Sequence, residues 1–309
     1  LYLIINNLSA IDFLKTSGDT IVNENNEKII LQGFGLGGWV VLEGYMWNCY
    51  IEHASTSRME NAIEYLVGQD KKKEFLDLYR KNYITEKDIK YISDNNFNAL
   101  RVPLHYRDFS PNFMEFTNEG FELLDSLIVW GNRHNIYLVL DMHAAPGAQN
   151  TSDFSDSEIN GDSELFTSYA NQRWLASTWK YIANYYKNEP VIAGYDLLNE
   201  PARAGIATTL RNIYEQCIDS IRTVDQNHIV IIEGNWYGND HTGLFPPFDQ
   251  NIVYSFHHYV GGINDTLTMY NQYRNDIALR YNVPLWVGEF GENSNVWGNR
   301  IKEFFNRNN

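Results

Sequence analysis

Two glutamates stand where two apolar runs of the chain end. Residues 191–198 run into an Asn-Glu-Pro sequence that contains Glu200, and residues 284–288 run into Glu289. Short apolar runs of this kind indicate buried strands of a parallel sheet, and the proline after Glu200 ends its strand because it has no N–H to donate. Two carboxyl groups in one pocket could transfer protons or attack a substrate, provided that both strands end at the same rim.

Other polar and aromatic residues follow the remaining predicted strands in the same way. They are Glu43, Arg101, Asp141, His143, Asn199, Trp236, His257 and Tyr259. Each alone has a structural explanation, since a histidine can be a satisfied core residue and Arg101 can balance a buried aspartate. Burying so many polar groups together costs free energy unless they bind one another or a ligand. We therefore expect one polar pocket at these strand ends.

The elements that must position these residues alternate between strands and helices. The predicted strands are 29–39, 97–104, 136–140, 191–198, 228–234, 252–259 and 284–289. The predicted helices between and after them are 85–93, 119–134, 171–187, 206–224, 267–281 and 295–305. This alternation, without linker or repeat, predicts a parallel sheet. Polar ends on seven successive strands favour an α/β, (β/α)8 TIM barrel over a doubly wound open sheet, with strand eight not visible in the sequence.

The whole chain, residues 1–309, is predicted to form a single barrel domain. A hairpin at about 12–28 precedes the first strand, and a long first loop at about 44–84 contains helical periodicity. Residues 1–8 are apolar but lack the basic start and the cleavage site of a signal peptide.

The charge of the chain restricts its partners. The net charge is −15, which argues against a nucleic acid because binding a polyanion needs a basic face. No apolar run reaches the roughly 18 residues that span a bilayer, so we expect no membrane insertion. A neutral substrate is compatible with this charge.

Six short stretches occur along the chain in a fixed order. They are Gly37-Gly38-Trp39, Leu100-Arg101-Val102-Pro103, the stretch 141–147, Leu198-Asn199-Glu200-Pro201, Phe256-His257-His258-Tyr259 and Gly288-Glu289-Phe290. In these stretches and in their order, the chain resembles glycoside hydrolase family 5, the cellulase family of retaining barrel enzymes. The stretches 36–43 and 145–150 are most similar to its exo-1,3-glucanase branch, and the segment 85–101 is equally similar to bacterial endoglucanases.

The resemblance implies that Glu200 is the acid/base and Glu289 the nucleophile. Retaining hydrolysis needs one protonated and one ionised carboxyl group, about 5–5.5 Å apart. A guanidinium such as that of Arg101 near Glu289 would keep Glu289 charged, and that second anion would favour the protonated form of Glu200.

The resemblance also implies a set of substrate-binding and supporting residues. These are Arg101 and Tyr259, which hold the nucleophile, Asn199, which binds the sugar 2-hydroxyl, the pocket histidines His143 and His257, the sugar-binding carboxylate Glu43, and Trp236. The chain departs from the family at Gly35, where many relatives have Asn, and at strand eight, which in the family ends in an aromatic sugar platform. Trp297 lies too close to Glu289 in the sequence to replace that platform.

We therefore expect a retaining hydrolase of β-glucosidic bonds in β-glucan, with β-1,4-glucan such as cellulose as the first choice and β-1,3-glucan as the second. Endo or exo action depends on whether the segments 44–84 and 146–168 close one end of the cleft. We expect no cofactor or metal, a monomer, and an extracellular or periplasmic location, because polymeric substrates usually lie outside the cell.

Two alternatives stay open. A barrel without its eighth strand could bind carbohydrate without catalysis. A metal-dependent barrel hydrolase could use Asp141, His143 and the pair His257-His258 as ligands, but that class has an His-x-His sequence at the first strand, where this chain has glycines.

Overall fold

The computed structural model describes residues 11–49, 51–158, 161–259, 263–291 and 294–308 of the 309-residue chain. The apolar stretch 1–8 lies outside these residues, as do positions 159–160 of the segment 146–168. Within the described part, no helix combines the length and the apolar character needed to cross a bilayer.

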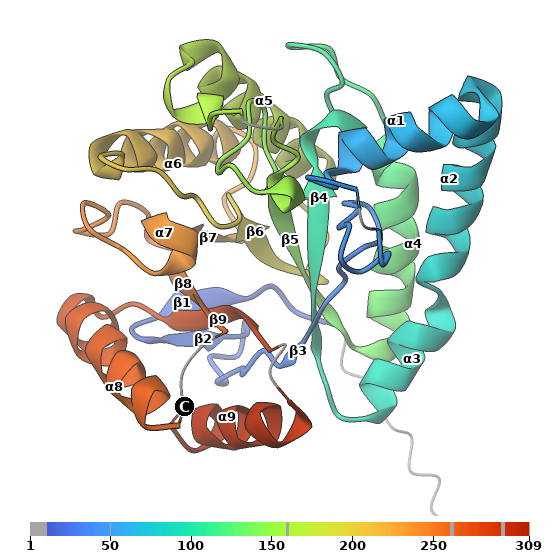
Figure 1. Cartoon of the computed structure of the whole chain (residues 1–309). Coiled ribbons are helices and arrows are strands. Elements are labelled where there is room, and N and C mark those ends of the chain that lie inside the picture. The colour runs from blue at the N-terminus through green and yellow to red at the C-terminus, as the bar shows by residue number, and fades with distance from the viewer. Residues whose placement is uncertain (1–10, 50, 159–160, 260–262, 292–293, 309) are drawn as a thin grey trace, which may run out of the picture.

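Seven parallel strands form the central sheet, and neighbours in the sheet are also neighbours in the chain. They are β3 (Gly33–Gly35), β4 (Ala99–His105), β5 (Tyr137–Ala144), β6 (Ile192–Asp196), β7 (Ile229–Glu233), β8 (Ile252–His258) and β9 (Leu285–Phe290). The sheet curls almost into a cylinder, with helices outside it (Figure 1). This arrangement confirms the α/β barrel predicted from the sequence. All residues of β4, β6, β7 and β8 are buried, as expected for strands covered on both faces.

The barrel has an open seam between β3 and β9. Among the described residues β3 pairs only with β4 and β9 only with β8, and no eighth strand joins them. The three residues of β3 are exposed, and Phe290 at the end of β9 is 38% exposed. These two strands are more exposed than the others because each lacks a neighbour on one side.

Helices cover the outside of the sheet and return the chain from one strand to the next. The helices after the first strand are α1 (Thr56–Val67), α2 (Gln69–Tyr83), α3 (Glu86–Asp94), α4 (Glu119–His134), α5 (Tyr169–Tyr186), α6 (Ala207–Arg222), α8 (Ile263–Tyr273) and α9 (Asn295–Asn308), and the π-helix η4 (Arg274–Leu279) extends α8. Short helical turns in the loops are η1 (Tyr106–Asp108), η2 (Asp153–Ser155), η3 (Glu164–Phe166) and α7 (Asn235–Gly238).

Helix α4 illustrates how the sequence specifies these elements. Its apolar residues Phe121, Leu124 and Leu127 recur at helical spacing and are buried against the sheet. Glutamates occupy its first turn and basic residues its last turn, which complements the helix dipole. Asn135 ends the helix in a left-handed conformation with φ 55°.

A hairpin closes the end of the barrel away from the polar strand ends. Its strands β1 (Lys15–Ser17) and β2 (Thr20–Val22) are antiparallel. Leu14 and Ile21 of this hairpin pack in one buried cluster with residues from the barrel strands, namely Val139, Ala193, Ile229, Ile231 and Val253. The amino ends of the strands are therefore filled with apolar side chains, and the opposite rim is left for polar ones.

The long first loop contains helices α1 and α2, and hydrogen bonds join it to the loop after β5. Leu42, Met59 and Leu76 pack in a separate apolar cluster inside the first loop. Asp156 of the second loop accepts hydrogen bonds from the backbone N–H and the hydroxyl of Ser57, both at 2.6 Å. The two loops are therefore one connected wall above the rim.

Candidate active site

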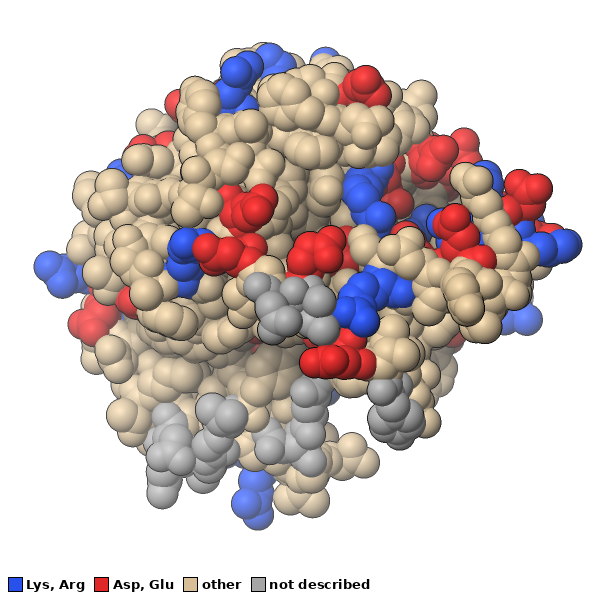
Figure 2. Space-filling view, turned by 45° about the horizontal axis from the view of Figure 1, so that its top comes forward, with Lys and Arg blue, Asp and Glu red and all other residues tan. Residues whose placement is uncertain are grey.

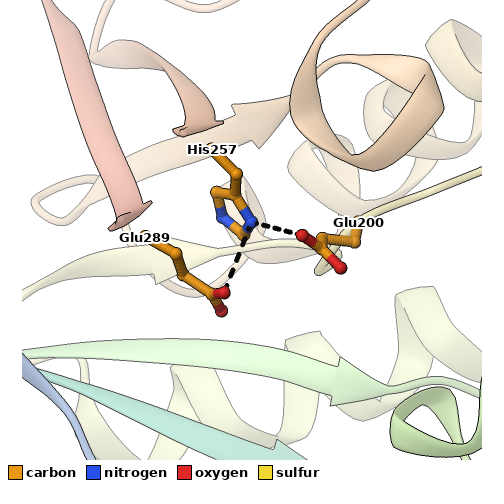
Figure 3. Close-up of side chains that lie close together, drawn as sticks. All are labelled: Glu200, His257 and Glu289. Carbon is orange, nitrogen blue, oxygen red and sulfur yellow. Dashed lines mark hydrogen bonds and ion pairs between the residues drawn. The ribbon is translucent and has the colours of Figure 1, made fainter. Parts of the chain in front are cut away.

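Glu200, which follows β6, and Glu289 in β9 lie in the same pocket. One carboxylate oxygen of Glu200 lies within 4.8 Å of one carboxylate oxygen of Glu289, and the imidazole of His257 lies between the two residues (Figure 3). The two residues meet because parallel strands of a barrel end at one rim. The separation is close to that of a carboxyl pair in which one member attacks and the other transfers a proton.

Glu289 is held as a carboxylate by donors on both oxygens. Nη1 of Arg101 donates to Oε1 at 2.5 Å, and the hydroxyl of Tyr259 donates to Oε2. Burial acts to raise the pKa of Glu289, but the positive charges of His257, Arg101 and His143 outweigh burial and lower the pKa to about 2. Glu289 is therefore ionised at neutral pH, as a nucleophile must be.

Glu200 is held by its backbone as well as its side chain. Its φ is 49°, a left-handed conformation that a non-glycine residue rarely adopts. Its N–H donates to Oε2 of Glu233 at 2.8 Å, and its carbonyl accepts from Asn150 at 2.9 Å. Oε1 of its carboxyl group lies 2.7 Å from Nδ1 of His257. The strained turn directs the carboxyl group towards Glu289 and His257.

Arg101 on β4 joins the ends of several strands. Its guanidinium donates to Asp196 at 2.9 Å, to Asn199 at 2.9 Å and to Glu233 at 3.0 Å, in addition to Glu289. Burial lowers the pKa of Arg101, but the surrounding carboxylates outweigh burial and raise it. A buried cation of this kind is tolerated because its three nitrogens donate hydrogen bonds to these partners.

His143 forms a second positive centre beside the pair. Its Nδ1 lies 2.7 Å from Oδ2 of Asp141, the residue two positions earlier on β5. Burial lowers the pKa of His143, but the charge of Asp141 and its hydrogen bond raise that pKa to about 9. Glu43 also faces His143, and burial raises the pKa of Glu43 above its usual value.

A groove of about 1570 Å³ opens onto these residues and continues into the seam between β3 and β9. At the rim it is lined by Glu43, Tyr45, Met46, Arg101, His143, Phe154, Glu200, Tyr237, Tyr259 and Glu289. In the space-filling view, several acidic side chains gather in the middle of the face turned towards the viewer (Figure 2). Aromatic walls with a few polar groups suit a polar ring-shaped ligand.

Ten residues at strand ends are named from the sequence, and the structure brings nine of them to one place: Asp141, which binds His143, and eight others. Those eight are Glu43, Arg101, His143, Asn199, Glu200, His257, Tyr259 and Glu289. Trp236 is instead 48% exposed and is not among the side chains that line the groove, whereas Tyr237 is. Both have left-handed φ angles, 53° and 59°, so the turn presents the tyrosine to the groove in place of the tryptophan.

Sequence reasoning missed two buried carboxylates that contact the site. Asp196 and Glu233 are both fully buried, and both bind Arg101. Glu233 ends the apolar run 229–232 as Glu200 and Glu289 end theirs, so the same signal could have found it. Asp196 lies before two leucines inside an apolar strand, and only its contact with Arg101 reveals it.

Glu200, His257 and Glu289 also offer three atoms that could hold a metal ion. All three already have protein partners: both oxygens of Glu289 accept hydrogen bonds, and Nδ1 of His257 lies 2.7 Å from Glu200. A metal ion would have to replace these contacts, because an atom that binds a metal must carry no proton and cannot keep its hydrogen-bonding partner in the same direction.

Comparison with known proteins identifies relatives for most of the chain. The sequence model of the family described as cellulase (glycosyl hydrolase family 5) matches residues 54–306. A beta-xylosidase of Phanerodontia chrysosporium is 32% identical over 251 residues, which are 80% of this chain and 52% of that protein. Endoglucanase C of Acetivibrio thermocellus is 32% identical over 181 residues, 57% of this chain and 50% of that protein.

A probable glucan 1,3-beta-glucosidase A of Aspergillus fumigatus is 26% identical over 234 residues, 74% of this chain and 56% of that protein. The chain thus spans about half the length of these curated relatives. Two solved structures share the fold. Beta-glucanase SdGluc5_26A of Saccharophagus degradans has a TM-score of 0.65 and 17% identity, and the match covers 96% of this chain and 81% of that one. Endoglucanase Cel5A of Thermobifida fusca has a TM-score of 0.61 and 15% identity, and the match covers 96% of this chain and 82% of that one.

Proposed function

The chain belongs to the cellulase family, glycosyl hydrolase family 5, and we propose that it hydrolyses β-glucosidic bonds of β-glucan with retention of configuration. The observation that carries this proposal is the carboxyl pair, with one oxygen of Glu200 and one of Glu289 within 4.8 Å of each other. A pair this close leaves no room for a water molecule to attack from behind the sugar, so it supports double displacement.

In the first step Glu289 attacks the anomeric carbon. The bond from that carbon to the glycosidic oxygen breaks, and the carboxyl group of Glu200 gives its proton to the leaving oxygen. The departing sugar leaves as a neutral alcohol, and the remaining sugar is covalently bound to Glu289.

In the second step a water molecule replaces the departed sugar. Glu200, now a carboxylate, takes a proton from the water while the water oxygen attacks the anomeric carbon and Glu289 leaves. The two inversions give a product with the configuration of the substrate. Both catalytic groups return to their starting protonation states.

The surrounding side chains support the first step. Arg101 and Tyr259 bind separate oxygens of Glu289 and fix the direction of its attack. Arg101 also binds Oδ1 of Asn199 at 2.9 Å, which fixes the amide so that its nitrogen, 3.5 Å from Nε2 of His143, can donate to a sugar hydroxyl. His143 and Glu43 add further hydrogen-bonding groups on the same wall of the groove.

The first-choice substrate is β-1,4-glucan, and β-1,3-glucan is the second. The named relatives include an endoglucanase, a probable glucan 1,3-beta-glucosidase and a beta-xylosidase. The wall made by the two fastened loops brings Tyr45 and Phe154 to one side of the groove, which favours binding near a chain end. Because such polymers lie outside cells, an extracellular or periplasmic location suits this activity.

A product profile tests the proposal. The purified protein is incubated with cello-oligosaccharides, laminari-oligosaccharides and xylo-oligosaccharides, and the products are separated by chromatography. We expect release of glucose or short gluco-oligosaccharides from the first two, and no release from the xylo-oligosaccharides. Binding of these sugars without any release would support a carbohydrate-binding barrel in place of the hydrolase.

A further inference from the structure

A third carboxylate lies directly behind the catalytic pair. Glu233 is the last residue of β7 and is fully buried. It contacts three groups of the site: the backbone of Glu200, the imidazole of His257 and the guanidinium of Arg101. No step of the mechanism above uses it, and it does not line the groove.

The first contact fixes the backbone of Glu200. A non-glycine residue in the left-handed region is strained and keeps that conformation only when its surroundings hold it. Glu200 has φ 49°, and its N–H donates to Oε2 of Glu233 at 2.8 Å. On the other side Asn150 binds the Glu200 carbonyl at 2.9 Å. Glu233 is thus one of two side chains that pin the strained residue.

The second contact reaches both catalytic carboxylates through His257. Nε2 of this histidine lies 3.1 Å from Oε1 of Glu233, at an angle that makes an ion pair but no hydrogen bond. On the other side of the ring, Nδ1 lies 2.7 Å from Glu200 and 3.5 Å from Glu289, as the dashed lines in Figure 3 show. The imidazole therefore links Glu233 to both members of the pair.

The neighbouring glycines leave space for this arrangement. A Cβ atom at Gly288 would lie 2.9 Å from Nε2 of His257. A Cβ atom at Gly238 would lie 3.3 Å from Oε2 of Glu233 and 3.2 Å from the backbone nitrogen of His257. Side chains at either position would press on the Glu233–His257 contact, so the surrounding backbone is shaped around it.

We propose that Glu233 is a positioning residue, whose single buried carboxylate holds both the backbone of the acid/base Glu200 and the imidazole that touches both catalytic glutamates. The inference rests on the proposed function, because only a reaction at this pair makes the orientation of Glu200 important. Glu233 would thereby hold the direction of Glu200 and, through His257, support the charge on Glu289.

The electrostatics of the cluster agree with this role. Burial lowers the pKa of His257, but the charge of Glu233, followed by that of Glu289, outweighs burial and raises it well above its usual value. The charged imidazole in turn lowers the pKa of Glu289. The titratable and charged groups that face Glu233 are Arg101 on β4, Asp196 on β6, Glu200, Tyr214 on α6, His257 on β8, and His241 in the loop before β8.

The test compares the full chain with two variants at this position. Glu233→Gln keeps the shape and an acceptor oxygen but removes the charge, and Glu233→Asp keeps the charge but shortens the reach to Glu200. We measure kcat, KM and the pH dependence of kcat/KM, the titration of the His257 ring by NMR, and the thermal unfolding midpoint.

For Glu233→Gln we expect the His257 titration to move to lower pH and the acidic limb of kcat/KM to move to higher pH. We expect kcat to fall about 100-fold, the cost of a misplacement of about 1 Å, with little change in KM. For Glu233→Asp we expect a similar loss of kcat while the His257 titration stays near that of the unaltered protein.

Asp225→Asn is the matched control. Asp225 is another buried carboxylate paired with a histidine, with Oδ2 2.5 Å from Nδ1 of His228, but it lies away from the groove. We expect it to lower the unfolding midpoint without moving the acidic limb or kcat. Glu233 variants that behave like Asp225→Asn, or that leave the His257 titration and kcat unchanged, would overturn the inference. If the unaltered protein hydrolyses no glycan, the proposed function fails, while the His257 titration still decides whether Glu233 controls the imidazole.

Discussion

Nη1 of Arg101 lies 2.5 Å from Oε1 of Glu289, and the same guanidinium reaches Asp196, Asn199 and Glu233. One side chain on β4 therefore ties the proposed nucleophile on β9 to the ends of β6 and β7. The geometry of a guanidinium allows this, because its five N–H groups point in fixed directions in one plane. The site is a connected network, and changes to its members should not act independently.

Arg101→Lys should disrupt this network although it keeps the charge. A lysine ammonium cannot reach all four partners at once, so buried carboxylates lose donors. We expect a loss of about 3–5 kcal/mol in the free energy of unfolding and a large fall in kcat/KM, measured by urea denaturation and steady-state kinetics. Arg222→Lys is the control, since Arg222 binds Asp249 through two nitrogens at 2.9 Å away from the groove. Equal effects of the two variants on kcat/KM would contradict a special role for Arg101.

Tyr259→Phe should make Glu289 easier to protonate. The Tyr259 hydroxyl binds Oε2 of Glu289 and helps to hold its pKa near 2, below its usual 4.5. Because the folded-state pKa is depressed, this ion contributes stability that is present above about pH 4.5 and is lost as the pH falls through about 2. We expect the acidic limb of kcat/KM to move to higher pH in the variant.

Tyr254→Phe serves as the control for that change. Tyr254 lies on β8, the strand that Tyr259 directly follows, but its hydroxyl donates to the carbonyl of Leu244 in the core. It should lower stability by about 1 kcal/mol, the net value of an ordinary hydrogen bond, and leave the acidic limb where it is. An unmoved limb in Tyr259→Phe would mean that the hydroxyl does not influence Glu289.

Asp141→Asn should lower the pKa of His143. Burial lowers that pKa, but Asp141 outweighs burial and raises it from 6.5 to about 9. Because the folded-state pKa is raised, the pair contributes stability that is fully present below pH 6.5 and is lost as the pH rises through about 9. In the variant we expect the His143 ring, followed by NMR, to titrate at lower pH and this stability to be absent at neutral pH.

Glu86→Gln tests whether any carboxylate–histidine pair has this effect. Glu86 lies 3.0 Å from His134 on the surface, between α3 and α4. Exposed pairs contribute little because water screens them, so we expect almost no change in stability with pH. A His143 titration that is the same in Asp141→Asn and the unaltered protein would contradict the assignment.

Removal of metal ions should leave hydrolysis unchanged. In the proposed mechanism the ionised Glu289 attacks the sugar and Glu200 donates the proton, so no step needs a metal ion. The three possible ligand residues also contact one another and Arg101 and Tyr259. We expect dialysis against EDTA to leave kcat/KM unaltered. A loss that added zinc or manganese restores would favour a metal-dependent reaction.

Much of the fold could be predicted because the strands carry a strong local signal. Seven apolar runs each end in polar residues, and helices with apolar spacing such as α4 separate them. The open seam between β3 and β9 agrees with the seven predicted strands, since the described part of the chain adds no eighth strand to the central sheet. The turn at Trp236 and Tyr237 was harder, because two consecutive left-handed residues decide which ring faces the groove.

The network behind the catalytic pair could not be predicted from spacing. Asp196 and Glu233 are separated by a whole helix, and each contacts Arg101 only because β4, β6 and β7 converge in the barrel. The strand-end signal could have marked Glu233, as it marks Glu200 and Glu289, but that signal does not reveal its partners. The role proposed for Glu233 depends on its 2.8 Å hydrogen bond with the backbone N–H of Glu200, a contact that exists only in the folded structure.

The most direct test of the account is the configuration of the products that azide forms with two variants. Glu289→Ala and Glu200→Ala are each given an activated aryl β-glucoside with sodium azide, and the anomeric proton of the product is read by NMR. Azide should take the place of the missing nucleophile in Glu289→Ala and give the α-glycosyl azide. It should attack the covalent intermediate in Glu200→Ala and give the β-glycosyl azide. Full activity without azide in either variant, or the reverse pair of anomers, would contradict the assignment of the two glutamates.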